Sequence, residues 1–128
     1  MVSVPGRSSG RTLLLVEDDR ELRESLAELL KDSGFDVQCV ENGREALDYL
    51  EGFPPPCLVL LDLMMPVMNG WEFREAQAKN EKLAGIPVVI LTADGRADLK
   101  ARALGVTDYL RKPIDVERLL GMVQRFGC

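Results

Sequence analysis

Five short strand-like segments alternate with amphipathic segments along the 128 residues of the chain. The strand-like segments cover residues 12–16, 35–40, 57–61, 86–91 and 107–110. The stretch after each of them has apolar residues at helical spacing, as at Leu22, Leu26 and Leu29. Alternation of this kind predicts a parallel sheet with helices on both faces, joined by right-handed crossovers. We therefore expect one doubly wound α/β domain.

The middle apolar segment, residues 57–61, is apolar at every position. This is the pattern of a central parallel strand that helices cover on both faces. Gly34 and the three prolines at 54–56 mark the ends of the first two helices. The predicted helices lie at about 22–30, 44–51, 71–83, 97–104 and 115–126.

The start of the chain differs from the rest, because residues 1–11 are rich in Ser, Gly and Pro. They lack the apolar core of a secretory signal, and we expect a flexible tail followed by one domain at 12–128. The apolar segments elsewhere are too short to cross a bilayer. We expect a cytoplasmic protein. The sequence does not decide between a stand-alone regulator and a part of a longer protein.

Composition excludes several classes of function. The chain has no histidine, which removes the usual zinc sites, a Ser/His/Asp triad and a Cys/His dyad. Its formal charge of −5 argues against the broad positive surface that binds nucleic acid. Neither GxGxxG nor GxxxxGK[ST] follows the first strand, so a nucleotide-binding enzyme is disfavoured. The remaining chemistry is that of carboxylates, hydroxyls and lysine.

The three cysteines, Cys39, Cys57 and Cys128, have neither metal-ligand spacing nor a CxxC pair. We expect them to be small buried or terminal thiols in a reducing compartment.

Polar residues gather where the predicted strands end. Glu17 and Asp18 end the first strand, Asp62 the third and Thr92 the fourth, and Lys112 follows the fifth. One such residue alone is more often a helix cap or a turn residue. The carboxyl ends of parallel strands meet at one edge of the sheet, where ligands of this fold class bind. Their joint placement therefore favours a functional site.

The chemistry of these five groups is complementary. Carboxylate oxygens suit Mg²⁺, and three clustered acids without a cation would raise the pKa of at least one of them. With the metal present, Asp62 could attack phosphorus as a carboxylate nucleophile and form an acyl phosphate. The hydroxyl of Thr92 and the ammonium of Lys112 could hold phosphoryl oxygens. Asp19 is the member of the acidic run that we expect to cap the first helix.

Four motifs carry a resemblance to a known family: LLLVEDD at 13–19, LVLLDLMMPVMNG at 58–70, VVILTA at 88–93 and DYLRKPID at 108–115. From about residue 12 to residue 126 the sequence resembles the response-regulator receiver domains of two-component signalling, such as the chemotaxis regulators. The resemblance implies a flavodoxin-like three-layer sandwich with strand order 2-1-3-4-5.

The resemblance also implies a metal shell and a phosphoacceptor. Glu17 and Asp18 look like the acidic pair, with Asp18 a direct Mg²⁺ ligand, and Asp62 looks like the phosphoacceptor and a further ligand. The backbone carbonyl of Met64 would complete the share of the shell that the protein supplies.

The switch residues follow from the same resemblance. Thr92 looks like the switch hydroxyl, Tyr109 like the switch aromatic and Lys112 like the lysine of the family. The family implies a cis peptide bond before Pro113, which an X-Pro bond makes inexpensive. Phosphorylation would change the surface formed by the fourth helix, the fifth strand and the fifth helix.

The chain has no histidine, so the phosphoryl group cannot come from a phosphohistidine on this chain and a separate donor is required. The resemblance indicates which donor to expect. The expected donor is a histidine kinase or a histidine phosphotransfer domain, and the expected target is a downstream protein. We expect no direct contact with nucleic acid or membrane. A homodimer that forms on phosphorylation is left open.

Two other functions would use similar residues. A hydrolase of the aspartyl-phosphatase type needs a second Asp two residues after the nucleophile, and Met64 occupies that place. A receiver-like module that binds its partner without phosphorylation would bind equally well after loss of Asp62.

The implied strand order also places Cys39 and Cys57 two strands apart, too far for a disulfide. Both are therefore expected to be free thiols.

Overall fold

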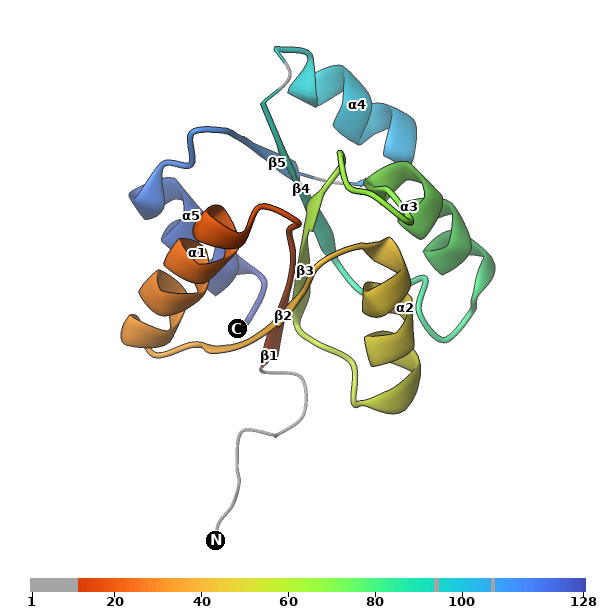
Figure 1. The fold of residues 1–128 in the computed structure, drawn as a ribbon, viewed down its shortest axis with the longest axis horizontal. Helices are drawn as coiled ribbons and strands as arrows, with labels where there is room; N and C mark the ends of the chain where they lie inside the picture. Colours follow the sequence, from red (N-terminus) through yellow and green to blue (C-terminus); the bar gives the residue numbers. More distant parts are fainter. Residues whose placement is uncertain (1–11, 94, 107) are drawn as a thin grey trace, which may run out of the picture.

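The computed structural model describes residues 12–93, 95–106 and 108–128 (Figure 1). The strands are β1 (Thr12–Val16), β2 (Asp36–Val40), β3 (Leu58–Asp62), β4 (Val88–Thr92) and β5 (Asp108–Arg111). The helices are α1 (Arg20–Asp32), α2 (Gly43–Gly52), α3 (Gly70–Lys79), α4 (Ala97–Leu104) and α5 (Val116–Arg125). The predicted tail at residues 1–11 and the first residue of the predicted fifth strand, Thr107, lie outside the described residues.

The strands form one parallel sheet in the order β2-β1-β3-β4-β5, which confirms the predicted doubly wound topology. The register aligns the carboxyl ends of neighbouring strands. Val16 pairs with Leu61, so the next residues along, Glu17 and Asp62, follow side by side. Thr92 pairs with Arg111 at the far side of the sheet. One edge of the sheet thus carries the polar residues that the sequence singled out.

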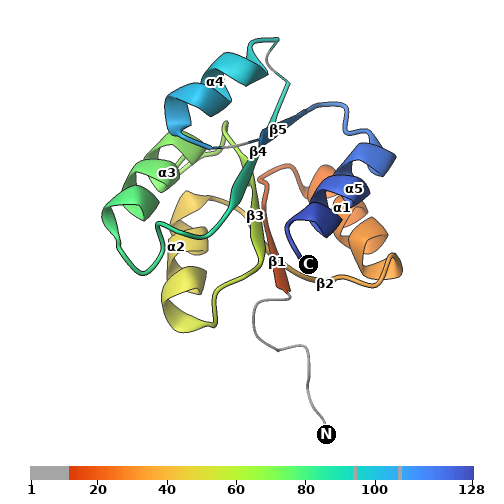
Figure 2. The ribbon, with the colours of Figure 1, turned by 180° about the vertical axis from the view of Figure 1, so that it is seen from behind.

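Helices cover both faces of the sheet. α1 and α5 lie on one face, and α2, α3 and α4 lie on the other (Figures 1 and 2). Leu13 and Leu15 of β1 pack into the layer of α1 and α5, whereas Leu14 and Val16 pack into the layer of α2 and α3. This alternation explains why the central strands need apolar residues at every position. No helix within the described ranges combines the length and apolar character that a membrane span requires.

The third helix is shorter than its apolar pattern predicts, because α3 ends at Lys79 and not at Leu83. Leu83 is still buried, but in a turn. The fully buried side chain of Gln77 stabilises this turn by donating hydrogen bonds to the carbonyls of Leu83 (2.9 Å) and Ile86 (3.0 Å). Leu83 continues the helical spacing of apolar residues past the end of α3, although it lies in a turn.

The predicted bounds of two central strands also shift. β3 runs from Leu58 to Asp62 and β4 from Val88 to Thr92, so Asp62 and Thr92 are the last residues of their strands. The carbonyl of Pro87 accepts a hydrogen bond from Val59 just before β4 begins. Asp62 and Thr92 are therefore held in place by the backbone hydrogen bonds between the strands of the sheet.

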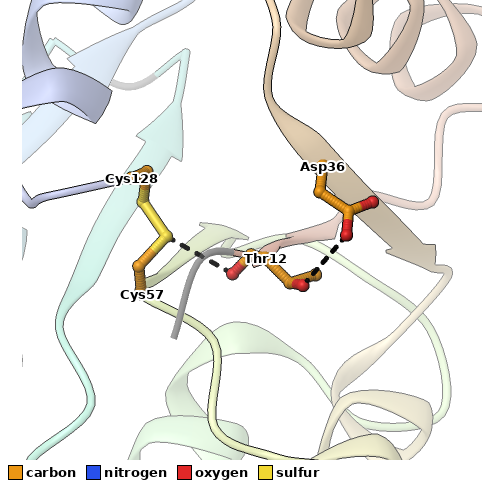
Figure 3. The surroundings of a disulfide bond; sticks show 4 residues. All are labelled: Thr12, Asp36, Cys57 and Cys128. Carbon is orange, nitrogen blue, oxygen red and sulfur yellow. Dashed lines mark hydrogen bonds between the residues drawn. A yellow bond between two sulfur atoms is a disulfide. The ribbon is translucent and has the colours of Figure 1, made fainter. Parts of the chain in front are cut away.

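The expectation of free thiols is wrong for two of the three cysteines. Cys57 and Cys128 form a disulfide, with their Cα atoms 5.7 Å apart, and Cys39 is free and exposed (Figure 3). The chain after α5 turns back toward the start of β3, a contact that strand order alone does not predict. The Cys57 sulfur lies 3.4 Å from the carbonyl oxygen of Thr12. This is a contact and not a hydrogen bond, because a disulfide sulfur carries no proton.

Candidate functional site

Three carboxylates converge at the carboxyl edge of the sheet. Glu17 and Asp18 follow β1, and Asp62 ends β3. One oxygen of each lies within 4.8 Å of the others. Glu17 is fully buried, Asp62 is 4% exposed and Asp18 is open to solvent. The structure thus brings together the three acids that the sequence predicted, and Asp18 is the exposed member of this cluster.

Lys112 reaches into this cluster from the end of β5. Its Nζ lies 3.0 Å from Oε1 of Glu17 and 3.5 Å from Oδ1 of Asp62. Its backbone N–H donates to the carbonyl of Thr92 at 2.8 Å, which ties the ends of β4 and β5 together. The peptide bond between Lys112 and Pro113 is cis. The ammonium is therefore placed between two buried acids.

Electrostatics at the site raise the pKa of Asp62 to about 7. Burial is the largest cause, the charge of Glu17 acts in the same direction, and the nearby ammonium of Lys112 opposes both. For Lys112, burial alone would lower the pKa, but the short contact with the Glu17 carboxylate and the charges of Asp62 and Glu17 outweigh it and raise the pKa. The carboxylate of Asp62 is thus poorly neutralised by the protein alone.

The loop after β3 folds back over Asp62. The backbone N–H of Met64 donates to Oδ1 of Asp62 at 3.3 Å, and the side chain of Met64 points into solvent. Gly70, the first residue of α3, donates from its N–H to the carbonyl of Leu63 at 3.0 Å. Both contacts hold the loop close to the carboxylate.

Replacement of Gly70 by alanine should lower the free energy of unfolding by about 1–3 kcal/mol, the usual effect of overpacking. A Cβ at this position would lie 2.7 Å from the carbonyl oxygen of Asp62 and 2.8 Å from Cα of Leu63. Backbone atoms cannot move away cheaply. Gly121→Ala in α5 is the matched control, because nothing lies within 4 Å of its Cβ. Urea denaturation should show this control gaining up to about 1 kcal/mol, and equal effects of the two variants would refute the steric argument.

The two predicted switch residues lie on neighbouring strands. Thr92 is buried at the end of β4, and Tyr109 is half-buried on β5, where it pairs with Ile90. Tyr109 packs against a small cluster of Leu63, Ile90 and Ala101 under α4. The structure therefore places the tyrosine on the far side of β4 from β3, next to the helix that the predicted switch involves.

The site fits a hard divalent cation. Its donors are carboxylate oxygens, and three acids face one ammonium, so the cluster is electron-rich. Oε1 of Glu17 is buried and has the ion pair with Lys112, but it makes no hydrogen bond of ordinary geometry within the described part of the chain. Mg²⁺ is typically held by one or two carboxylates and several waters. The residues present suit this ion.

One contributor to the site is singled out by no sequence pattern. Arg23 in α1 donates hydrogen bonds from its guanidinium to the carbonyl oxygens of Glu17 and Asp18. Its only sequence signal is its place in the first turn after the capping residue Asp19, whose side chain accepts from the N–H of Leu22 as expected.

Comparisons with known proteins agree with this fold. Residues 13–124 match the family model for the response regulator receiver domain. The chain belongs to this family of signalling modules of two-component systems.

Relatives of known sequence include the probable transcriptional regulator ycf29 of Pyropia yezoensis, 40% identical over 115 residues. The match covers 87% of this chain and 50% of that protein. The transcriptional regulatory protein CrdR of Helicobacter pylori is 41% identical over 120 residues, with 91% and 54% covered. The chain thus spans about half the length of the curated relatives it matches.

Solved structures show the same fold. The chemotaxis protein CheY4 of Vibrio cholerae superposes with a TM-score of 0.81 at 30% identity, covering 92% of this chain and 99% of that one. The receiver domain of the sensor histidine kinase PA1611 from Pseudomonas aeruginosa has a TM-score of 0.83 at 28% identity, covering 92% and 98%. That structure has a magnesium ion coordinated in its active site cleft.

Proposed function

We propose that this chain is a phosphoacceptor receiver domain, spanning residues 12–128, in which Asp62 takes a phosphoryl group from a phosphohistidine donor. The observation that carries the proposal is the placement of the Asp62 carboxylate. It is buried, its pKa is raised to about 7, and Lys112 lies 3.5 Å away beside two further acids. Perturbed carboxylates of this kind gather at functional sites.

The chemical step needs positioning and charge neutralisation more than acid or base groups. An oxygen of Asp62 forms a bond to phosphorus as the bond from phosphorus to the donor's imidazole nitrogen breaks. The imidazole leaves with that electron pair and takes up a proton. Glu17, Asp18, Asp62 and the carbonyl of Met64 would hold Mg²⁺, which supplies positive charge to the carboxylates and the phosphoryl oxygens.

Two side chains are suited to hold the transferred group. The ammonium of Lys112 already lies between Glu17 and Asp62, so an arriving phosphoryl oxygen can take over one of its contacts. Thr92 ends the neighbouring strand β4, in register with the residue that precedes Lys112. A hydroxyl and an ammonium on one side, and the cation on the other, would bind the three peripheral oxygens.

The same placement supports a switch. Movement of Thr92 toward the phosphoryl group would leave space beside β4 for Tyr109 to turn inward. Arg111 on β5 donates to the carbonyl of Gly95 at 2.9 Å, so β5 is tied to the loop before α4. We propose that phosphorylation shifts the population of conformations of the α4–β5–α5 face and thereby changes the affinity for a downstream protein.

The proposed partners and place of action follow. A separate donor is needed because this chain has no histidine, and membership of the receiver family suggests a histidine kinase or a histidine phosphotransfer domain as that donor. The protein would act in the cytoplasm without direct contact with a membrane. Its formal charge of −5 also argues against direct contact with nucleic acid. Its catalysis would be limited to its own phosphorylation and dephosphorylation.

Incubation with acetyl phosphate and Mg²⁺ is expected to add one phosphoryl group, which mass spectrometry of peptides should locate at Asp62. Asp62→Asn should remain unmodified, because its amide is not a nucleophile. Asp48→Asn, which changes an exposed carboxylate on α2, should be phosphorylated like the wild type. Phosphorylation of the Asp62→Asn variant at the wild-type level would refute the assignment. Steady hydrolysis of a phosphomonoester would instead support the alternative function, a hydrolase of the aspartyl-phosphatase type.

A further inference from the structure

Arg23 binds the backbone of the acidic pair and not its carboxylates. Its Nη1 lies 2.8 Å from the carbonyl oxygen of Glu17 and 3.4 Å from that of Asp18. The Arg23 side chain is only 13% exposed, and its other terminal nitrogen lies 3.9 Å from Glu41, an exposed residue after β2. The cation therefore spans the segment between β1 and α1 from within the first turn of the helix.

These contacts fix a segment that has few other anchors. The N–H of Glu17 donates to the carbonyl of Val40, and the N–H of Asp19 donates to the carboxylate of Glu17 at 3.2 Å. Asp18 lies between them with an exposed side chain, so its direction depends on how its peptide groups are held. Hydrogen bonds from a charged donor are among the stronger ones, and partners that orient metal ligands strongly affect metal affinity.

We propose that Arg23 is a positioning residue for the metal site, which holds the carbonyls of Glu17 and Asp18 so that their carboxylates face the cation. This inference rests on the proposed function, because it concerns Mg²⁺ binding by the same acids. In this role the positively charged side chain of Arg23 strengthens the binding of a positive ion, which its charge alone would weaken.

Removal of Arg23 has opposite effects on Mg²⁺ affinity in a positioning role and in a purely electrostatic role. If Arg23 acted only through its charge, removal of that charge would tighten the binding of a divalent cation. If it acts by orienting the ligands, its removal weakens binding despite the gain in negative charge. The sign of the change in affinity therefore decides between the two.

The experiment is a titration of the folded protein with MgCl₂, followed by amide chemical shifts. Arg23→Met is expected to bind Mg²⁺ about tenfold more weakly than the wild type, and Arg23→Lys should fall between them because it keeps a donor. Arg20→Met is the matched control, because it removes a positive charge from the same turn of α1, where Arg20 is 81% exposed and pairs with Glu24. It should bind at least as tightly as the wild type. Equal or tighter binding by Arg23→Met would overturn the proposal.

A second readout needs no metal. The amide of Asp19 should exchange its hydrogen faster in both Arg23 variants than in the wild type and in Arg20→Met, whereas an unchanged rate would overturn the positioning role. At saturating Mg²⁺ the phosphorylation rate of the variants by acetyl phosphate should recover, because the defect lies in metal affinity. If the wild type binds no Mg²⁺, the metal part of the proposed function fails, and hydrogen exchange then decides the role of Arg23 alone.

Discussion

At pH 8 and without divalent cations, an Asp62→Asn variant is expected to be more stable than the wild type by on the order of 4 kcal/mol. The pKa of Asp62 is about 7 in the folded protein, against an ordinary value of 3.8. Folded protein therefore binds more protons than unfolded protein between about pH 4 and pH 7. The wild type loses stability as the pH rises through this window, and the loss is complete above it. Asparagine cannot ionise, so the variant avoids this loss.

Urea unfolding in EDTA at several pH values would test this expectation. The stability difference between variant and wild type should vanish near pH 4, grow up to about pH 7 and then level off. Asp48→Asn is the control, because Asp48 is exposed and its ion pair with Arg44 is worth less than about 1 kcal/mol. Added Mg²⁺ should narrow the gap at pH 8 by stabilising the native wild type. A gap that does not depend on pH would contradict the raised pKa.

Reduction of the Cys57–Cys128 bond is expected to lower the free energy of unfolding by about 4 kcal/mol. The bond joins residues 71 positions apart, so it closes a long loop and restricts the unfolded chain. Cys57→Ala should match the reduced wild type and should no longer respond to a reducing agent. Cys39→Ala should keep the full response, because Cys39 is not part of the bond.

Denaturation with and without a phosphine reductant gives the energies, and alkylation under denaturing conditions gives the bonding. Oxidised protein should react at Cys39 alone and reduced protein at all three cysteines. Reaction at three cysteines in protein exposed to oxidised glutathione would contradict the bond. Such bonds are rare in reducing compartments, so alkylation of protein trapped inside cells would also test the proposed cytoplasmic location.

The sheet topology was predictable because local chemistry dictates it. The central strands are short apolar runs, and a run such as residues 57–61 is the pattern of a strand that helices cover on both faces. The end of α3 was not predictable in this way. Leu83 continues the helical spacing, but the amide of Gln77 holds it in a turn, and this contact depends on tertiary packing.

At the site, the convergence of Glu17, Asp18 and Asp62 followed from parallel strands that end at one edge. A raised pKa for at least one of the clustered acids also followed from the sequence. At Asp62 burial is the largest cause of the raised pKa, and the charge of Glu17 adds to it. The contacts of Arg23 were not predictable from the sequence. Its partners are backbone carbonyls, which every residue has, so no residue type marks the contact. The pairing of Cys128 depends on where the chain runs after α5, which the periodicity of a helix does not determine.

The disulfide makes residues 57–128 a closed covalent ring, with β1, α1, β2 and α2 attached as an open branch. A single proteolytic cut inside the ring leaves one covalent molecule until the bond is reduced. A single cut in the branch releases its amino-terminal part at once under denaturing conditions. Asp62, Thr92 and Lys112 lie within the ring, whereas Glu17 and Asp18 lie on the branch. Covalent connectivity thus divides the acidic pair from the residues that would carry and hold the phosphoryl group.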